Sequence, residues 1–225
     1  MLGDLDAAYA RSAAEIDDLK LPAAAGATAV DLGAGLGLHA LALARRGFKV
    51  TAIDSCQVLL DELQTRSKGL AVSVHNADIL DFASYLTQRP ALIVCMGDTL
   101  THLSSVAALS SLLDSAADSL TPAGVFVATF RDYASRELHG EARFIPVRAD
   151  EQRILTCFLE YAGDHVTVYD VLNSKEDGRW RQSVSSYPKL KVAPDWIEAK
   201  FTGRGFKVSR DATSNGMVRI VATAG

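Results

Sequence analysis

The sequence predicts an α/β fold built on a mostly parallel β-sheet, with a small antiparallel insertion late in the chain. Over the first 130 residues, short apolar runs rich in β-favouring residues alternate with longer runs of helical periodicity. Such alternation implies right-handed crossovers between parallel strands. From about residue 143 to 191, strand-like runs separated only by turn residues take over.

The elements of the first part follow in order along the chain. Strand-like runs occupy residues 28–32, 49–54, 70–76, 91–96 and 124–130. Helical patterns occupy residues 37–47, 56–67 and 103–120, with a short helical piece near 81–86. Gly47 suits the end of the first helix, because glycine readily adopts the left-handed conformation that closes many helices. Ser55 is the expected N-cap of the second helix.

The later part of the chain predicts hairpins, one helix and two closing strands. Turn residues at 162–164 and 176–178 separate the strand-like runs 152–161, 165–173 and 179–192. A helix with Pro194 in its first turn and two strands follow at 194–206, 207–211 and 217–224. No repeat or linker interrupts the chain, so we interpret residues 1–225 as one domain that carries the insertion.

The composition and charge of the chain limit the classes of function that it can have. Hydrophobic residues make up 48% and charged residues 22% of the chain, which favours a substantial core over disorder. The formal net charge is −4, and neither half of the sequence carries the basic stripe of a nucleic-acid-binding protein. A small-molecule substrate is therefore expected, with no nucleic-acid partner.

Cysteine, histidine and leader patterns exclude several further classes. The three cysteines are far apart and odd in number, and the histidines lack metal-ligand spacing, so neither a disulfide framework nor a metal site is expected. The N-terminus is acidic, which does not fit a secretory signal. No apolar run reaches membrane-spanning length. We expect a cytoplasmic protein without membrane association.

A glycine-rich stretch between the first strand and the first helix predicts a ligand-binding loop. The dinucleotide fingerprint GxGxxG would place its third glycine at position 38, but Leu38 stands there and the glycine is Gly37. A P-loop would need a lysine, which is absent. Asp31, just before the glycines, would repel phosphate and suits an ammonium group. Asp54, at the end of the second strand, can accept hydrogen bonds from two ribose hydroxyls.

These features resemble class I S-adenosylmethionine-dependent methyltransferases. The resemblance rests on "DLGAGLG", on Asp54 at 21 residues after Gly33, and on "HNADILDF" and "IVCMGDTLTHL" after the next two strands. It implies a Rossmann-like, seven-stranded, mostly parallel sheet with helices on both faces and an antiparallel insertion after strand five. It also implies S-adenosylmethionine as cofactor and S-adenosylhomocysteine as product.

The resemblance assigns cofactor roles residue by residue. The glycine loop would lie along the methionine and ribose parts, and Asp54 would clamp the ribose. Asp78 would bind the adenine amino group, although an acidic residue there is also a simple helix N-cap. The full expected cofactor set is Asp31, Gly33, Ala34, Gly35, Asp54, Ser55, Asp78, Ile79, Met96 and Gly97.

Three short segments resemble the glycine and sarcosine N-methyltransferases more narrowly. "CMGDTLTHL" is similar to their "CLGNSFAHL"-type segment, "TFRDY" to their D-x-R-N-Y segment and "SSYPKL" to their S-Y-Y-P segment. Three positions depart from this pattern, because Asp98, Thr129 and Asp132 replace the branch's asparagine, aspartate and asparagine. These departures put glycine itself in doubt as the acceptor.

The same segments supply the expected acceptor site. Arg131 would bind a carboxylate through its planar guanidinium, whereas Asp98 would favour a cationic amine or a polar N–H. Tyr187 would close the site from the insertion, His102 would orient the acceptor or the methionine end, and Tyr9 would belong to an N-terminal lid. Catalytic roles are expected for His102, Arg131 and Tyr187, and substrate contacts for Asp98, Arg131, Tyr187 and Tyr9. A surface ion pair, core packing and a capping histidine remain the alternatives for Arg131, Tyr187 and His102.

The resulting expectation is methyl transfer to a small molecule, with an amine nitrogen as the target in preference to the oxygen or sulfur of a small natural product. A protein that binds S-adenosylmethionine without catalysis is the alternative from another class. No general base is assigned at this stage, and the oligomeric state is left open, with a homo-oligomer as one option.

Overall fold

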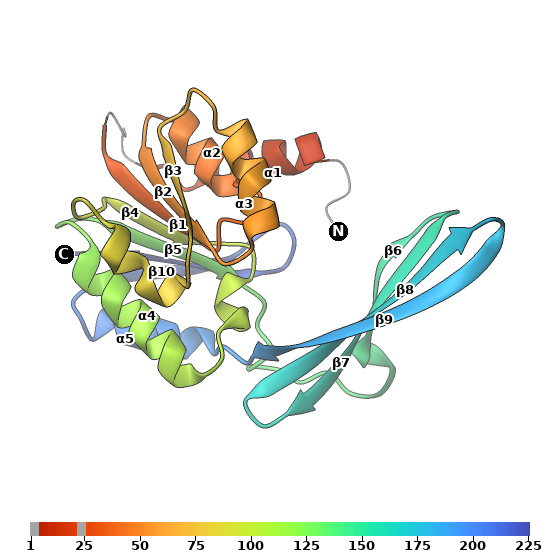
Figure 1. Cartoon of the computed structure of the whole chain (residues 1–225). Coiled ribbons are helices and arrows are strands. Elements are labelled where there is room, and N and C mark those ends of the chain that lie inside the picture. The colour runs from red at the N-terminus through yellow and green to blue at the C-terminus, as the bar shows by residue number, and fades with distance from the viewer. Residues whose placement is uncertain (1–4, 22–25) are drawn as a thin grey trace.

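In the computed structural model, which describes residues 5–21 and 26–225, a seven-stranded sheet carries the fold (Figure 1). The strand order is β10-β11-β5-β4-β1-β2-β3. The strands are β1 (Thr28–Leu32), β2 (Lys49–Asp54), β3 (Val72–Asn76), β4 (Leu92–Cys95), β5 (Val125–Phe130), β10 (Lys207–Ala212) and β11 (Val218–Thr223). Strands β1 to β5 are parallel, and β11 pairs antiparallel with β5 and β10. The predicted Rossmann-like, mostly parallel sheet is confirmed.

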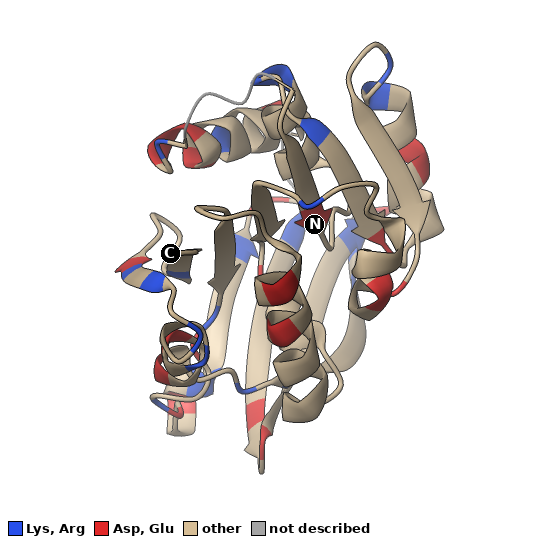
Figure 2. Cartoon of the chain, turned by 90° about the vertical axis from the view of Figure 1, so that its left-hand side faces the viewer, with Lys and Arg blue, Asp and Glu red and all other residues tan. Residues whose placement is uncertain are grey.

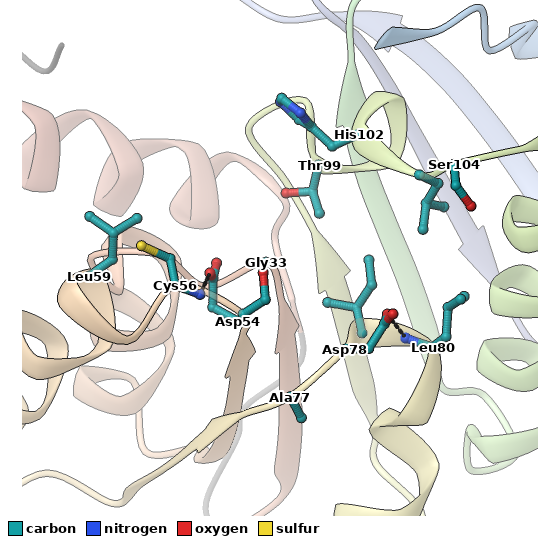
Figure 3. Close-up of a pocket in the computed structure, with 13 residues that line it drawn as sticks. Gly33, Asp54, Cys56, Leu59, Ala77, Asp78, Leu80, Thr99, His102 and Ser104 are labelled. Carbon is teal, nitrogen blue, oxygen red and sulfur yellow. Dashed lines mark hydrogen bonds between the residues drawn. The ribbon is translucent and has the colours of Figure 1, made fainter. Parts of the chain in front are cut away.

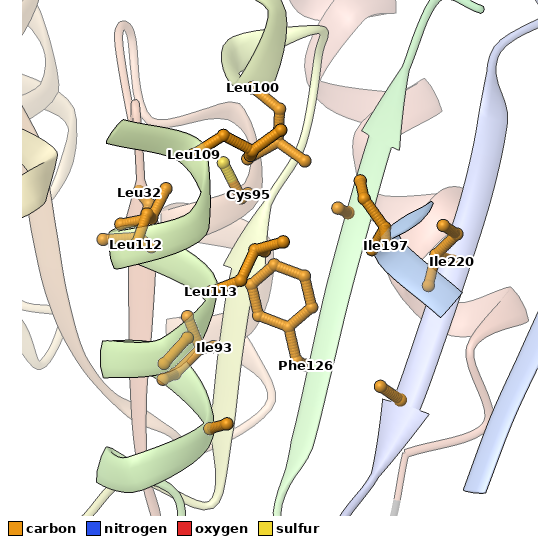
Figure 4. Close-up of a cluster of buried hydrophobic side chains, with 14 of the residues drawn as sticks. Leu32, Ile93, Cys95, Leu100, Leu109, Leu112, Leu113, Phe126, Ile197 and Ile220 are labelled. Atoms are coloured by element: carbon orange, nitrogen blue, oxygen red, sulfur yellow. The ribbon is translucent and has the colours of Figure 1, made fainter. Parts of the chain in front are cut away.

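Helices cover both faces of this sheet. On one face, α1 (Leu5–Asp18), α2 (Leu38–Arg45) and α3 (Gln57–Arg66) bury apolar side chains against the sheet. On the other face lie α4 (Val106–Ser119), α5 (Pro194–Thr202) and the 3₁₀ helix η1 (Ile79–Tyr85). Figure 4 shows leucines of α4 and Ile197 of α5 packed against Ile93 and Phe126 of the sheet. The central strands β1, β4 and β5 are therefore buried on both sides, which accounts for their apolar runs.

Two helix starts differ from the sequence prediction. Ser55 is not the N-cap of α3, because the carboxylate of Asp54 accepts the N–H of Cys56 and delays the helix to Gln57, with Cys56 at the cap. The helix expected from residue 103 begins only at Val106. Ser105 caps it, its hydroxyl accepting the N–H of Ala108 at 3.1 Å. The residues before this cap form the short 3₁₀ helix η2 (Thr99–His102).

The insertion is a separate sheet of four antiparallel strands that projects from the main sheet (Figure 1). It follows the 3₁₀ helix η3 (Gly140–Arg143) and contains β6 (Phe144–Ala149), β7 (Arg153–Ala162), β8 (His165–Glu176) and β9 (Arg179–Leu190). The sequence patterns indicated β7, β8 and β9 but missed β6. A bulge between Pro146 and Arg148 disturbs the pairing of β6 and hides its alternation.

Charges of both signs are interspersed over the side of the molecule shown in Figure 2. Several of them tie elements together: Lys200 of α5 pairs with Asp114 of α4 at 2.7 Å, and Arg204 pairs with Asp118. Within residues 5–21 and 26–225, no helix has both the length and the apolar character needed to cross a membrane.

Candidate active site

The glycine loop after β1 requires glycine for close packing as well as for backbone conformation. Gly33, Gly35 and Gly37 all have positive φ angles, of 74°, 51° and 78°. A Cβ atom on Gly33 would lie 2.4 Å from the Thr99 methyl group, and one on Gly37 would lie 2.1 Å from a methyl of Leu63. Gly37, the residue that breaks the dinucleotide spacing, is therefore needed to let the loop pack against α3.

Asp54 is fixed at the end of β2 by backbone donors on either side. Its Oδ2 accepts the N–H of Gly35 at 2.8 Å, and its Oδ1 accepts the N–H of Cys56 at 2.8 Å. Each carboxylate oxygen can accept more than one hydrogen bond, so both can still accept donors from a ligand. The loop and the carboxylate are thus held together as one rigid unit.

A cavity of about 650 Å³, which we call the cofactor cavity, opens in front of this unit. Figure 3 shows Asp54 and Asp78 on one side of it, with Thr99 and His102 facing them. It is lined by Gly33, Asp54, Ser55, Cys56, Leu59, Ala77, Asp78, Ile79, Leu80, Thr99, His102, Leu103 and Ser104. Both polar and apolar side chains therefore line the cavity.

Five of the expected cofactor residues line this cavity: Gly33, Asp54, Ser55, Asp78 and Ile79. Asp78 is the N-cap of η1, because its Oδ1 accepts the N–H of Leu80 at 2.9 Å, and its contact with the adenine stays a prediction. The other five are placed differently. Ala34 and Met96 are buried, Gly35 supports Asp54, Gly97 borders a second cavity, and Asp31 lies beneath the loop.

Asp31 is a buried carboxylate with an unsatisfied oxygen. Only 1% of the residue is exposed, and its Oδ2 has no hydrogen-bond partner among the described residues. Burial raises the pKa of this carboxyl to about 6. An unpaired buried carboxylate is costly unless a positive or hydrogen-bonding group approaches it, which fits the ammonium group that the sequence predicted near this position.

The second cavity, of about 710 Å³, lies between the ends of β4 and β5 and the inner face of the insertion. We call it the acceptor cavity. Three of the predicted substrate residues meet there, namely Asp98, Arg131 and Tyr187. Other lining residues include Asp132, Tyr133, Arg136, Cys157, Leu159, Tyr161, Val168 and Lys189. The guanidinium of Arg131 forms no salt bridge with any residue in the described part of the chain, so the alternative of a surface ion pair is not observed.

His102 connects the two cavities. It lines the cofactor cavity, and its ring stacks on Tyr187 of the acceptor cavity with centroids 5.8 Å apart and planes inclined by 24°. Burial, followed by the nearby Lys189 cation, lowers the pKa of the imidazole below its usual value. The ring is therefore neutral at physiological pH and has a nitrogen lone pair that can accept a proton.

Asp98 does not act as the free carboxylate that the sequence suggested. Its Oδ1 accepts the backbone N–H of Arg131 at 2.8 Å, and its Oδ2 pairs with the ammonium of Lys189. The side chains of Lys189 and Asp98 are only 8% and 4% exposed. The negative charge expected to attract an amine is therefore already neutralised within the protein.

Sequence analysis missed Lys189, although a signal for it existed. Lys189 is two residues after Tyr187 in the same strand, so both side chains point to the same face of the insertion. The loop that carries Asp98, the partner of Lys189, is held by Thr129, which is one of the positions that depart from the N-methyltransferase pattern. The Thr129 hydroxyl accepts the N–H of Gly97 at 2.8 Å, and its carbonyl accepts that of Asp98 at 2.9 Å.

Tyr187 is part of a polar network on the inner face of the insertion. Burial, followed by the negative charge of Asp170, raises the pKa of Tyr187 to about 12. Cys157 donates its thiol to the same Asp170 carboxylate at 2.9 Å. Tyr187 therefore remains a neutral hydroxyl, suited to orienting an acceptor rather than to removing its proton.

Tyr9 does not line the acceptor cavity, and its expected contact with the substrate stays a prediction. Its hydroxyl donates to the carbonyl of Leu36 in the glycine loop at 2.8 Å, and the Arg66 guanidinium lies 5.2 Å from its ring centre. The α1 helix packs on α2, and Tyr9 lines a separate pocket with Leu41 and Arg66. Tyr9 therefore supports the cofactor side of the molecule.

Comparisons with known proteins agree with this arrangement. Residues 29–124 match the model of a methyltransferase domain, whereas no curated protein matches the chain significantly. Among solved structures, the chain is similar to S-adenosylmethionine-bound CalS10, an amino pentose methyltransferase of calicheamicin biosynthesis from Micromonospora echinaspora. The two share 20% identity, with a TM-score of 0.81 and coverage of 100% and 98% of the two chains.

Two further matches have the same architecture. The sugar N-methyltransferase KedS8 from Streptoalloteichus is 16% identical, with a TM-score of 0.71 and coverage of 97% and 87%. The glycopeptide N-methyltransferase MtfA bound to S-adenosylmethionine is 17% identical, with a TM-score of 0.66 and coverage of 95% and 87%. The fold is thus that of S-adenosylmethionine-dependent methyltransferases.

Proposed function

We propose that this protein is an S-adenosylmethionine-dependent methyltransferase that methylates an amine nitrogen of a small molecule. The observation that carries the proposal is the pair of adjacent cavities joined at His102 and Tyr187. One cavity has a glycine loop and a fixed carboxylate without any phosphate-binding lysine, and the other holds ionic and aromatic side chains. Two adjacent cavities of this kind suit a transfer reaction, in which one bound molecule donates a group and a second bound molecule accepts it.

The residues present fit the cofactor. Asp54 would accept hydrogen bonds from the ribose hydroxyls, Asp78 and Ile79 would contact the adenine, and Asp31 would face the positive charge of the amino-acid end. When bound, S-adenosylmethionine supplies a methyl group that its sulfonium already activates. The protein's own contribution is then to hold the acceptor in line, which can lower a barrier by about 7–11 kcal/mol.

Nitrogen is favoured as the target because the groups at the junction can prepare an amine. An amine must lose its extra proton before it can attack, and the neutral imidazole of His102 can accept that proton. Tyr187 would orient the acceptor through its hydroxyl and its ring. The amino pentose and sugar N-methyltransferases of the same fold support an amino sugar as the acceptor class.

A second candidate acceptor is a small amino acid, as in the glycine and sarcosine N-methyltransferases. The observation that favours it is the Arg131 guanidinium, which borders the acceptor cavity with no salt-bridge partner among the described residues. Arginine binds a carboxylate through two parallel hydrogen bonds. The two candidates differ in whether the acceptor must carry an anionic group near its amine.

Two measurements test the proposal. Calorimetry should show binding of S-adenosylhomocysteine and none of NAD, and tighter binding of NAD would refute the cofactor assignment. Release of S-adenosylhomocysteine should then be measured with amino sugars, amino acids, phenols and thiols as acceptors. Turnover confined to phenols or thiols would overturn the nitrogen assignment. Binding without turnover on any acceptor would favour a non-catalytic binding protein.

A further inference from the structure

One wall of the acceptor cavity is apolar, and part of it is exposed. Ile145 and Val147 of β6 line this cavity, yet 37% and 54% of these residues are exposed. Leu159 of β7 and Val168 of β8 also line it, and both are buried. Exposed apolar side chains that border a cavity are typical of ligand-binding grooves. We call these four residues the apolar wall.

Strand register shows that the apolar wall begins beside Tyr187 and leads away from it. Tyr187 of β9 is directly opposite Val168, and Val168 is directly opposite Leu159, so the three side chains form one row on the inner face. Ile145 is opposite Cys157, which lies two residues before Leu159 and therefore points to the same face. Neighbouring strands lie about 4.8 Å apart, so the far end of the wall on β6 is about 14 Å from β9.

The charged groups of the acceptor cavity come from other elements. Asp98 and Arg131 follow β4 and β5 of the main sheet, and Lys189 of β9 pairs with Asp98. Among the described residues that line the cavity, none from β6, β7 or β8 is charged. A ligand that fills the cavity therefore meets ionic groups around the ends of β4 and β5 and apolar groups along the inner strands of the insertion.

We propose that the methyl acceptor is an amine with an apolar body, and that the apolar wall binds this body while the amine reaches the junction of His102 and Tyr187. The inference rests on the proposed methyl transfer and names the acceptor class of the same site. An amino sugar or an amino acid can form the amine end of such an acceptor.

The size of the cavity supports an acceptor of this kind. Pockets of about 300–1,000 Å³ usually hold drug-sized ligands, and the acceptor cavity has a volume of about 710 Å³. An acceptor without an apolar body would leave Ile145 and Val147 in contact with water, so this part of the wall would contribute nothing to its binding.

The test compares two amines that differ only in their apolar chain, methylamine and hexylamine. Each methylene that is buried against the apolar wall should raise kcat/KM about 4-fold, which corresponds to about 0.8 kcal/mol. The longer chain, even when only partly buried, should therefore favour hexylamine by about 100-fold or more. Release of S-adenosylhomocysteine gives kcat/KM, and calorimetry with the S-adenosylhomocysteine-loaded protein gives the affinity for each amine.

A double variant assigns this preference to the apolar wall. Ile145→Ser/Val147→Ser leaves only the buried part of the wall and should reduce the preference for hexylamine to about 10-fold or less. Val184→Ser is the matched control, because Val184 is 57% exposed in the same sheet and lines neither cavity. It lies three residues before Tyr187, so its side chain points to the opposite face, and the variant should keep the wild-type preference. Circular dichroism and S-adenosylhomocysteine binding check that each variant is folded.

A wild type and a control that prefer hexylamine, together with a folded double variant that has lost the preference, support the inference. Equal kcat/KM for the two amines overturns it and leaves the methyltransferase assignment intact. A preference that the double variant retains, or that the control loses equally, overturns it as well. Where neither amine is turned over, the two affinities decide in the same way.

The failure of this inference is distinguishable from the failure of the proposed function. A protein that binds S-adenosylhomocysteine but not hexylamine overturns the inference, and the acceptor screen described above then decides the reaction. A protein that does not bind S-adenosylhomocysteine refutes the proposed function before any amine is added.

Discussion

The cofactor cavity and the acceptor cavity are built in different ways. The cofactor cavity is formed by four loops that follow the parallel strands β1 to β4 of one sheet, and the hydrogen bonds that fix Asp54 join residues at most 19 positions apart. The acceptor cavity brings β4 and β5 together with a separate sheet, and its central ion pair joins residues 91 positions apart. One continuous half of the sheet, from Gly33 to Ser104, therefore lines the first cavity, whereas the second needs the main sheet and the insertion to come together.

The first prediction tests the local character of the cofactor cavity. Asp54→Ala should weaken S-adenosylhomocysteine binding by about 100-fold or more, because two hydrogen bonds to a charged acceptor, each worth about 1.5–3 kcal/mol, are lost. Calorimetry measures the affinity, and circular dichroism confirms the fold. The matched control is Asp61→Ala, which removes an exposed carboxylate of the adjacent α3 and should leave affinity unchanged. Equal affinity in a folded Asp54→Ala protein would show that Asp54 is not the ribose clamp.

The second prediction tests the long-range character of the acceptor cavity. Lys189→Met leaves the Asp98 carboxylate buried without a counter-charge, which typically costs about 3–5 kcal/mol. For a chain of this size we expect a fall in Tm of about 6–20 °C in a thermal melt. The double variant Lys189→Met/Asp98→Asn should recover most of that loss, because no uncompensated charge remains.

Lys191→Met is the matched control for this experiment. Lys191 lies two residues further along and pairs with Glu137 at 2.7 Å, but Glu137 is 41% exposed. A partly exposed pair of this kind contributes about 1 kcal/mol or less. If Lys189→Met and Lys191→Met lower Tm equally, the buried pair does not hold the insertion to the main sheet.

The contrast between the two cavities also explains which site residues could be predicted from the sequence. The β1 loop and Asp54 were predicted because strand periodicity and glycine spacing are local signals, and Asp78 was predicted from the resemblance to class I methyltransferases. The narrower resemblance of three short segments supplied Asp98, Arg131 and Tyr187, which line one cavity, but it did not show that Lys189 neutralises Asp98. Pairing between distant strands has no local pattern.

Two further expectations differ from what the structure shows, for equally specific reasons. Tyr9 was placed over the substrate because the N-terminal helix was expected to be a lid. In the structure this helix packs on α2, and Tyr9 bonds to the glycine loop. Strand β6 was missed because its bulge interrupts the alternation. In both cases the contact that determines the structure is made with another part of the chain: α1 packs on α2, and β6 pairs with β7.

The third prediction concerns recognition in the acceptor cavity. If the acceptor carries a carboxylate, Arg131→Ala should raise its KM by about 10-fold or more, with unchanged affinity for S-adenosylhomocysteine. Arg131→Lys should not restore the KM, because lysine lacks the planar pair of donors. Steady-state kinetics with matched anionic and neutral amines would separate the two acceptor classes. Normal turnover of an anionic amine by both variants would exclude the amino-acid candidate.

The fourth prediction is a pH dependence on the cofactor side. The pKa of Asp31 is raised to about 6 by burial, so the carboxyl of the unliganded protein is mostly protonated below pH 6 and ionised at pH 7. A cationic ammonium favours the ionised form, so S-adenosylhomocysteine affinity should rise with pH and fall by up to about 10-fold between pH 6 and pH 5. Calorimetry at several pH values should show this slope in wild type and a flat profile in Asp31→Asn. A slope that persists in the variant would assign the proton to another group.

The smallest expected effect belongs to Tyr9, and it decides to which of the two cavities the α1 helix belongs. Tyr9→Phe removes one partly buried hydrogen bond to Leu36, worth about 0.5–1.5 kcal/mol, and should weaken S-adenosylhomocysteine binding by about 2- to 10-fold. Tyr169→Phe is the matched control, since its hydroxyl donates to Glu160 at 2.8 Å on the insertion, away from the loop. The acceptor KM should be unchanged in both variants at saturating cofactor. A rise in acceptor KM without loss of cofactor affinity in Tyr9→Phe would show that Tyr9 contacts the acceptor. A hydroxyl that only stabilises the glycine loop would not change the KM of the acceptor at saturating cofactor.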